Sequence, residues 1–177
     1  MNVIFLDFDG VLNTIHYSSN EDVERRISTL SDICHKYDAK VVICAASKDE
    51  IDEVTLETYN EWIKFVFDCF KKYNIECIGR TPNVRKRDNN GFYKEICKED
   101  EVRLYLYRHP EVTHYCVIDG DDFSDLNKIR NHLVKTLYYS SNKEEEGLLA
   151  SHINDVGEKL QEENEILRLI KRKSHKK

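Results

Sequence analysis

Residues 3–13 read Val-Ile-Phe-Leu-Asp-Phe-Asp-Gly-Val-Leu-Asn. The first four of these residues are all apolar, and they include two β-branched side chains and one aromatic ring. Two carboxylates and a glycine follow directly, and this pattern is typical of a fully buried strand that ends in a turn. Strands buried on both faces occur in parallel sheets that helices cover on each side. This stretch therefore favours an α/β fold.

The rest of the chain alternates between apolar strands and amphipathic helices. Further strands are predicted at residues 40–44, 75–78, 115–118 and 133–138, and helices at 20–34, 49–73, 101–107, around 126–129, and at 147–160. Asn20, ahead of Glu21 and Asp22, is predicted to cap the first helix. The alternation predicts a doubly wound, mostly parallel, Rossmann-like sheet with helices on both faces.

The length of 177 residues suits one domain, which we expect to span residues 1–162, followed by a charged helical extension at 163–177. The N-terminal apolar stretch contains two carboxylates and has no basic leader, so it does not resemble a signal peptide. No apolar run approaches the ~18 residues of a membrane span. Six scattered cysteines favour reduced, mostly buried thiols over disulfides or zinc ligands, and we expect a cytoplasmic protein.

Charge is distributed unevenly along the chain. The formal net charge of -6 argues against a general polyanion-binding module. The segment 80–98 is nevertheless basic and contains two aromatic residues, so it is either a solvated loop or a loop that faces the substrate. Its basic residues are Arg80, Arg85, Lys86, Arg87, Lys94 and Lys98, its acidic residues are Asp88 and Glu95, and its aromatic residues are Phe92 and Tyr93.

Two of the predicted strands end in acidic clusters. Asp7 and Asp9 follow the first strand, and Asp119, Asp121 and Asp122 follow the strand at 115–118. Ligands of such sheets bind at the carboxyl ends of the strands, so these carboxylates converge if the two strands are neighbours. Clustered carboxylates are typical ligands of Mg²⁺.

A carboxylate held beside a cation can attack a phosphorus atom in line, and a second acid two residues later can protonate the leaving oxygen and then activate water. Gly10 permits a tight turn, in which backbone N–H groups, those of Phe8 and Gly10 included, can face a phosphate. Taken alone, Asp-x-Asp-Gly is more often a turn with capping acids. Its place directly after a buried strand favours the catalytic interpretation.

Asp7-Phe8-Asp9-Gly10-Val11-Leu12-Asn13 resembles the first motif of the haloacid dehalogenase-like phosphatases. Residues 40–47 stand where the second motif belongs, Lys98 resembles the basic third motif, and residues 117–122 resemble the acidic fourth. Residues 135–136 and 147–148 are similar to the closing strand and helix of small members, including those with RNA-repair or nucleotide phosphatase roles.

The resemblance implies a role for each matched residue. Asp7 would be the nucleophile and a metal ligand, and Asp9 would be the general acid/base and offer its backbone carbonyl to a bound Mg²⁺. Lys98 would steady the nucleophile and the phosphate, although Lys94 and Arg103 are alternatives. Asp119 would complete the metal site, and Asp121 competes with it for this role.

The second motif departs from the family pattern, because its strand does not end in Ser or Thr. Phosphate contacts there would come from Ser47, or from Cys44 and backbone amides such as that of Ala45. As a thiol, Cys44 is better interpreted as a buried core residue than as a nucleophile. His16 and Tyr17 either line the substrate mouth or are merely exposed. The dispersed histidines show no zinc-binding pair.

The function that the resemblance implies is Mg²⁺-dependent hydrolysis of a phosphomonoester through an aspartyl-phosphate. Residues 13–20 and 49–80 leave no room for a large cap domain, and an open site suits a nucleotide or a nucleic-acid end. The alternative is a catalytically weak protein that binds a phosphate or a partner. The sequence does not indicate an oligomeric state.

Overall fold

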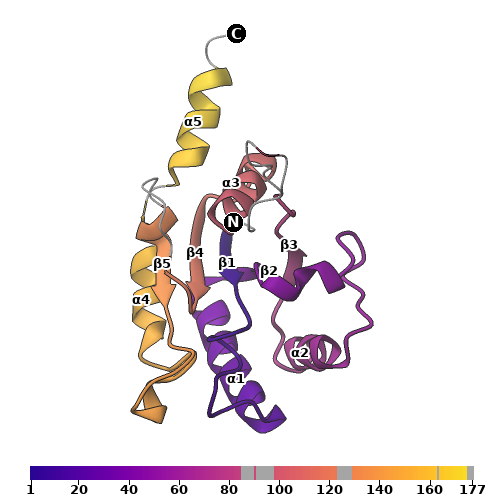
Figure 1. Ribbon diagram of the computed structural model, residues 1–177. Coiled ribbons are helices and arrows are strands. Elements are labelled where there is room, and N and C mark those ends of the chain that lie inside the picture. Colours follow the sequence, from indigo (N-terminus) through magenta and orange to yellow (C-terminus); the bar gives the residue numbers. More distant parts are fainter. Residues whose placement is uncertain (85–89, 91–97, 123–128, 163, 175–177) are drawn as a thin grey trace.

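The computed structural model describes residues 1–84, 90, 98–122, 129–162 and 164–174. Its centre is a parallel sheet in the order β3-β2-β1-β4-β5 (Figure 1). The strands are β1 (Asn2–Leu6), β2 (Ala39–Ile43), β3 (Cys77–Arg80), β4 (His114–Asp119) and β5 (Leu133–Lys135). The predicted doubly wound α/β fold is therefore confirmed, and no large cap domain is evident among the described residues.

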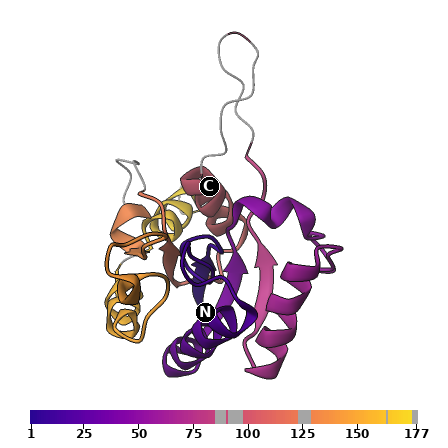
Figure 2. The same cartoon turned by 60° about the horizontal axis from the view of Figure 1, so that its bottom comes forward.

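Helices cover both faces of the sheet. They are α1 (Asn20–Tyr37), α2 (Glu61–Lys72), α3 (Lys98–Arg108), α4 (His152–Lys159) and α5 (Glu165–Ser174), with short 3₁₀ helices at Ala46–Glu50, Ile129–His132 and Lys143–Glu145. Helices α1, α2 and α4 lie on one face, where α1 packs against the other two, and α3 and α5 lie together on the other. Figure 2 looks onto the face with α1, in indigo, and α2, in magenta.

The two faces of the sheet divide the core into two layers. Along β1, Ile4 and Leu6 join the layer under α1, and Val3 and Phe5 join the layer under α3. The ring of Phe5 meets that of Tyr105 edge-on, with the ring centroids 5.4 Å apart. Because side chains alternate between two buried faces, a central strand must be apolar at every position, as residues 3–6 are.

The first helix is capped by a different residue from the one predicted. Ser19 is the N-cap, and its side chain accepts a hydrogen bond from the backbone N–H of Asp22, whereas Asn20 is the first residue of the helix. The helix continues to Tyr37 and ends at Asp38, which adopts a left-handed conformation.

The predicted helix at 49–73 is wrong in its first half, since α2 begins only at Glu61. The Asp52 carboxylate accepts hydrogen bonds from the backbone N–H groups of Val54 and Thr55, so this segment forms a turn. Leu56 has a positive φ of 59°, which a helix does not allow. Asn60 then caps α2 by accepting hydrogen bonds from two backbone N–H groups.

Smaller shifts affect the other elements. Strand β3 is displaced by two residues from the prediction at 75–78, and α3 begins at Lys98 rather than near 101. Strand β5 ends at Lys135, and α4 occupies only the second part of 147–160. The helix predicted around 126–129 falls largely outside the described residues.

The structure also bears on the cysteines and on the predicted absence of membrane spans. The described cysteines are free, and all but Cys77 are buried: Cys34, Cys44, Cys69, Cys77 and Cys116. Within the described part of the chain, none of the helices combines the length and the apolar character that a membrane span requires.

Candidate active site

The acidic ends of β1 and β4 lie side by side, because these two strands are neighbours in the centre of the sheet. Leu6 pairs with Ile118, and the backbone N–H of Asp7 donates to the carbonyl oxygen of Ile118 at 3.0 Å. Asp7 and Asp119 are therefore adjacent at the carboxyl edge. Both are buried, at 4% and 0% relative exposure.

Two glycines let the loops after these strands touch. Gly10 has a φ of +78°, and a Cβ atom at Gly120 would stand 3.2 Å from the Cα of Gly10 and 3.3 Å from the carbonyl oxygen of Asp9. Side chains larger than hydrogen would force these loops apart. Thr136, just beyond β5, holds the arrangement: its hydroxyl donates to the carbonyl oxygen of Gly10 at 2.6 Å, and its backbone N–H donates to that of Asp119 at 3.0 Å.

Lys98 lies among three carboxylates. Its ammonium nitrogen is 2.6 Å from Oδ2 of Asp7, 2.9 Å from Oδ2 of Asp119 and 3.5 Å from Oδ2 of Asp121. Lys98 is the first residue of α3, so the helix start fixes the position of the ammonium. Lys94 and Arg103 are the sequence-based alternatives for this role. Lys94 lies outside the described residues, and Lys98, not Arg103, contacts the carboxylates.

The environment shifts the pKa of these groups. Burial, and then the neighbouring Asp119 carboxylate, raise the pKa of Asp7 to about 7, although Lys98 opposes this shift. Burial likewise raises the pKa of Asp119. Burial alone would lower the pKa of Lys98, but the charges of Asp7 and Asp119 raise it, so the ammonium stays protonated.

The carboxylates are suited to a hard divalent cation. One oxygen each from Asp7, Asp119 and Asp121 lies within 4.8 Å of the others. Oxygen donors at such spacing fit Mg²⁺, which is usually held by one or two carboxylates with water and phosphate. The side chain of Asp9 is exposed and accepts a hydrogen bond from the Asn13 amide at 2.8 Å, and its backbone carbonyl lies against Gly120 in the loop after β4.

Asp122, the third acid after β4, does not belong to this group. Its carboxylate pairs with the ammonium of Lys135 at 2.5 Å. That ion pair joins the loop after β4 to the end of β5.

The segment after β2 offers little side-chain polarity to the site. Cys44 and Ala45 are buried, and Ser47 is half-buried in the 3₁₀ helix that follows. Burial raises the pKa of the Cys44 thiol to about 12, so the thiol is neutral at physiological pH. This supports the interpretation of Cys44 as a core thiol.

A buried ion pair beside the site was not predicted. The Lys48 ammonium lies 2.9 Å from Oε2 of Glu101, and both side chains are at most 1% exposed. Among the described residues, the other carboxylate oxygen of Glu101 has no hydrogen-bond partner. Glu101 is one helical turn after Lys98 on α3, so the pair ties the start of α3 to the segment after β2.

A second polar network supports the loop after β1. Glu146 is buried, its carboxylate lies 2.6 Å from Nδ1 of His16, and it accepts the backbone N–H of Ser140 at 2.9 Å. Arg26, also buried, donates to the backbone carbonyls of Leu12 and Glu146. Burial favours the protonated acid, but hydrogen bonds from Ser140 and His16 prevail and lower the pKa of Glu146 to about 2. His16, for which the sequence leaves open a place at the substrate mouth or mere exposure, is thus anchored.

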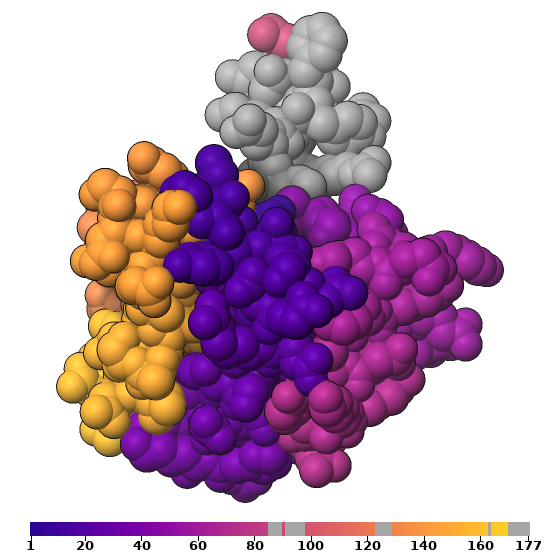
Figure 3. All heavy atoms as spheres, turned by 90° about the horizontal axis from the view of Figure 1, so that it is seen from below, coloured from indigo at the N-terminus to yellow at the C-terminus, as the bar shows by residue number. Residues whose placement is uncertain are grey.

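Tyr17 is anchored as well, since its hydroxyl donates to Glu144 at 3.0 Å. Figure 3 shows the loop after β1, in indigo, between the orange residues that follow β5 and the magenta residues of the β2–β3 region.

The basic segment 80–98 is mostly outside the described residues. Of its basic side chains, Arg80 donates to the carbonyl oxygen of Ile51 at 2.8 Å and lies 3.7 Å from Glu53. Lys98 belongs to the carboxylate cluster. These two basic residues therefore have partners within the protein, and a substrate-facing role for the other four stays a prediction.

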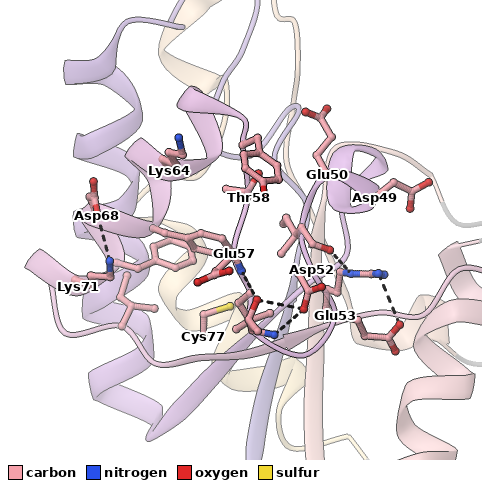
Figure 4. A pocket seen from close by; sticks show the side chains of 18 of the residues that line it. Asp49, Glu50, Asp52, Glu53, Glu57, Thr58, Lys64, Asp68, Lys71 and Cys77 are labelled. Atoms are coloured by element: carbon pink, nitrogen blue, oxygen red, sulfur yellow. Dashed lines mark hydrogen bonds and ion pairs between the residues drawn. The ribbon is translucent and has the colours of Figure 1, made fainter.

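A separate hollow of about 1290 Å³ lies beside β3, between α2 and the turn segment before it (Figure 4). Its acidic residues are Asp49, Glu50, Asp52, Glu53, Glu57, Asp68 and Glu76, and its basic residues are Lys64, Lys71 and Arg80. Neither Asp7 nor Lys98 lines it. Its excess of carboxylates opposes a phosphorylated ligand, so the carboxyl edge of β1 and β4 is the better candidate site.

Comparison with known proteins agrees with this geometry. Residues 3–145 match the model of a family described as the HAD domain in Swiss Army Knife RNA repair proteins. The match includes all of β1 except Asn2, strands β2 to β5, and every residue of the carboxylate cluster. No curated protein and no solved structure matches the chain.

Proposed function

Because the chain belongs to the family of HAD domains in Swiss Army Knife RNA repair proteins, which suggests a phosphatase-type hydrolase, we propose that it hydrolyses a phosphomonoester at a nucleic-acid end or on a nucleotide. The observation that carries the proposal is the convergence of Asp7, Lys98 and Asp119 at the carboxyl edge of the sheet.

Asp7 is the proposed nucleophile. One carboxylate oxygen is held by the backbone N–H of Phe8 at 2.8 Å and the other by Lys98 at 2.6 Å, so the side chain has a fixed direction. In the first step Asp7 forms a bond to phosphorus, and the bond from phosphorus to the leaving oxygen breaks. The products of this step are an aspartyl-phosphate and an alcohol.

Asp9 is the proposed general acid/base. Its carboxyl group, two residues after Asp7, is exposed and accepts a hydrogen bond from the Asn13 amide, so it is open to the oxygen that leaves and to the water that enters. It donates a proton to the leaving oxygen, and as a carboxylate it then removes a proton from the attacking water. That water displaces Asp7 from phosphorus, and both groups return to their initial states.

Asp7, Asp119, Asp121 and the backbone carbonyl of Asp9 are the proposed holders of Mg²⁺. Bound there, the cation would supply charge neutralisation for the phosphoryl group as it meets the carboxylates. Lys98 contributes a fixed positive charge from the start of α3, which favours the ionised form of Asp7 and attracts a phosphate. The proposed phosphate donors are the backbone N–H groups of Ala45 and Ser47 and the Ser47 hydroxyl. The N–H groups of Phe8 and Gly10, which were predicted to face the phosphate, instead donate to the Asp7 carboxylate and to the carbonyl oxygen of Asn13.

The direct test is turnover of p-nitrophenyl phosphate, with and without Mg²⁺, by the protein and by its Asp9→Asn variant. We expect Mg²⁺-dependent turnover that Asp9→Asn reduces by about 100-fold or more, as loss of a general acid/base does. The alternative, a protein that binds phosphate without turning it over, is favoured by one observation, the absence of Ser or Thr at positions 44–46. Saturable binding of inorganic phosphate without turnover of any phosphomonoester would support that alternative and contradict the proposal.

A further inference from the structure

We propose that residues 137–139, together with Ile15 and His16, form a stacking surface for the base of the nucleotide whose phosphate enters the site. This inference rests on the proposed function and specifies how the substrate is recognised. It concerns the loop after β5, a segment without an assigned role so far.

The surface is exposed although it consists of large apolar and aromatic side chains. The exposed fractions are 48% for Tyr138, 61% for Tyr139, 55% for Ile15 and 37% for Leu137. Single exposed apolar residues are normal on a protein surface, but a contiguous group marks a binding region. The group is contiguous, because the backbone N–H of Ile15 donates to the carbonyl oxygen of Tyr138 at 3.1 Å, and the rings of His16 and Tyr139 have centroids 5.6 Å apart.

The surface adjoins the catalytic loop directly. A Cβ atom at Gly10 would stand 3.3 Å from the Cβ of Tyr138, so Tyr138 packs directly against the Asp-x-Asp-Gly turn. Thr136, two residues earlier, bonds the carbonyl oxygen of Gly10. In a nucleotide the base is separated from its phosphate by one sugar. A phosphate at Asp7 therefore brings the base close to whatever surface borders Gly10.

The support beneath the surface is rigid. His16 is fixed by Glu146, which is itself buried and bonded to the backbone N–H of Ser140. Arg26 donates hydrogen bonds to the carbonyl oxygens of Leu12 and Glu146, and so joins the loop after β1 to the segment after β5. A platform that is already ordered loses little conformational entropy when a ligand binds, which suits a recognition surface.

The chemistry of the surface selects a base over a nucleic-acid strand. The exposed carboxylates of Glu144 and Glu145 accept hydrogen bonds from Tyr17 and Ser140, the chain neighbours of His16 and Tyr139, and such charges repel a run of phosphodiesters. Aromatic side chains stack on the faces of all bases without regard to sequence. The structure thus assigns one terminal base to this surface.

The test compares a nucleoside 5′-monophosphate with ribose 5-phosphate, which lacks the base. We expect Tyr138→Ala and Tyr139→Ala to raise KM for the nucleotide by roughly 5- to 150-fold, as loss of one stacking partner does, and to leave KM for ribose 5-phosphate unchanged. Tyr138→Phe and Tyr139→Phe retain an aromatic face and should retain the wild-type KM. Because Tyr138→Ala keeps the Cβ atom beside Gly10, the turn itself is undisturbed.

Tyr59→Ala is the matched control, since Tyr59 is 98% exposed and lies in the turn segment before α2. An equal loss on both substrates, or no loss on the nucleotide, would overturn the inference. Calorimetric binding of the same two ligands to the Asp7→Asn variant separates this inference from the proposed function. A preference for the nucleotide that the Tyr→Ala changes abolish supports the surface even if no turnover occurs, and equal binding of the two ligands contradicts it.

Discussion

The ammonium of Lys98 lies 2.6 Å from the carboxylate of Asp7, at the first residue of α3. This contact joins a residue of the first motif to one that is 91 positions away in the chain. It partly neutralises the buried carboxylates of Asp7 and Asp119.

Replacement of Lys98 by Met should abolish most of the activity. The change removes the cation that favours ionised Asp7 and that faces the phosphate, and we expect kcat to fall by about 100-fold or more. Arg103→Met is the matched control, because Arg103 is on the same helix and was the sequence-based alternative. If Arg103→Met lost activity and Lys98→Met retained it, the assignment of the basic residue would be wrong.

The raised pKa of Asp7 predicts a pH-dependent cost in stability without metal. The carboxyl has a pKa of about 7 in the folded protein, against an ordinary value of 3.8, so the folded state holds its proton more tightly. Ionised Asp7 therefore destabilises the fold increasingly as pH rises from about 4 to about 7. Asp7→Asn, which stays neutral, should become progressively more stable than the wild type over this range in chelator-treated protein.

Thermal unfolding at a series of pH values measures this difference. Added Mg²⁺ should raise the Tm of the wild type and narrow the gap, because it binds the folded carboxylates only. A gap that is constant from pH 4 to pH 7 would show that Asp7 titrates normally.

The two acids after β4 should differ as metal ligands. Asp119 is fully buried beside Asp7, whereas the side chain of Asp121 is 76% exposed. We expect Asp119→Asn to raise the Mg²⁺ concentration for half-maximal activity far more than Asp121→Asn does. A Mg²⁺ titration of the activity of both variants decides this, and the reverse order would make Asp121 the principal ligand.

Removal of one charge from the buried Lys48–Glu101 ion pair should lower the free energy of unfolding. Lys48→Met leaves the Glu101 carboxylate buried without a partner charge, which typically destabilises a protein by ~3–5 kcal/mol. The double variant Lys48→Met/Glu101→Leu removes both charges and should recover much of this loss. Denaturant unfolding measures both.

The exposed pair of Lys64 and Glu61 provides the control, because its loss should cost about 1 kcal/mol or less. A cost of that small size for Lys48→Met would mean that the Glu101 carboxylate finds another partner or takes up a proton.

Much of the fold and of the carboxylate cluster was predictable, because its signals are local. Residues 3–6 are apolar at every position and lead directly into Asp7, and the same pattern recurs before Asp119. Since β1 and β4 are adjacent, these local patterns were enough to bring the acids together. The resemblance at Lys98 indicated the third member.

Other features were not predictable from local patterns. The apolar stripe from Trp62 to Tyr73 favours a helix that starts at residue 49, but Asp52 and Asn60 bond nearby backbone N–H groups and so form a turn and a cap. The pairing of Lys48 with Glu101 depends on the position of α3 over the sheet, and neither residue carries a signal of burial. The hydrogen bond between Arg26 and Glu146 likewise depends on the folded structure, because the two residues are 120 positions apart in the chain.

If phosphate passes through Asp7, each turnover forms an aspartyl-phosphate at this residue, and the intermediate can be trapped. The protein is mixed with Mg²⁺ and a phosphomonoester, quenched in acid within one turnover, and digested for peptide mass mapping. We predict one phosphoryl group on the peptide that contains Asp7, and none in Asp7→Asn, which should also be inactive. With p-nitrophenyl phosphate, whose leaving group needs little protonation, Asp9→Asn should carry more of the phosphoryl group because water is no longer activated. Undiminished turnover by Asp7→Asn, or turnover in the wild type with the phosphoryl group on another residue, would contradict the account.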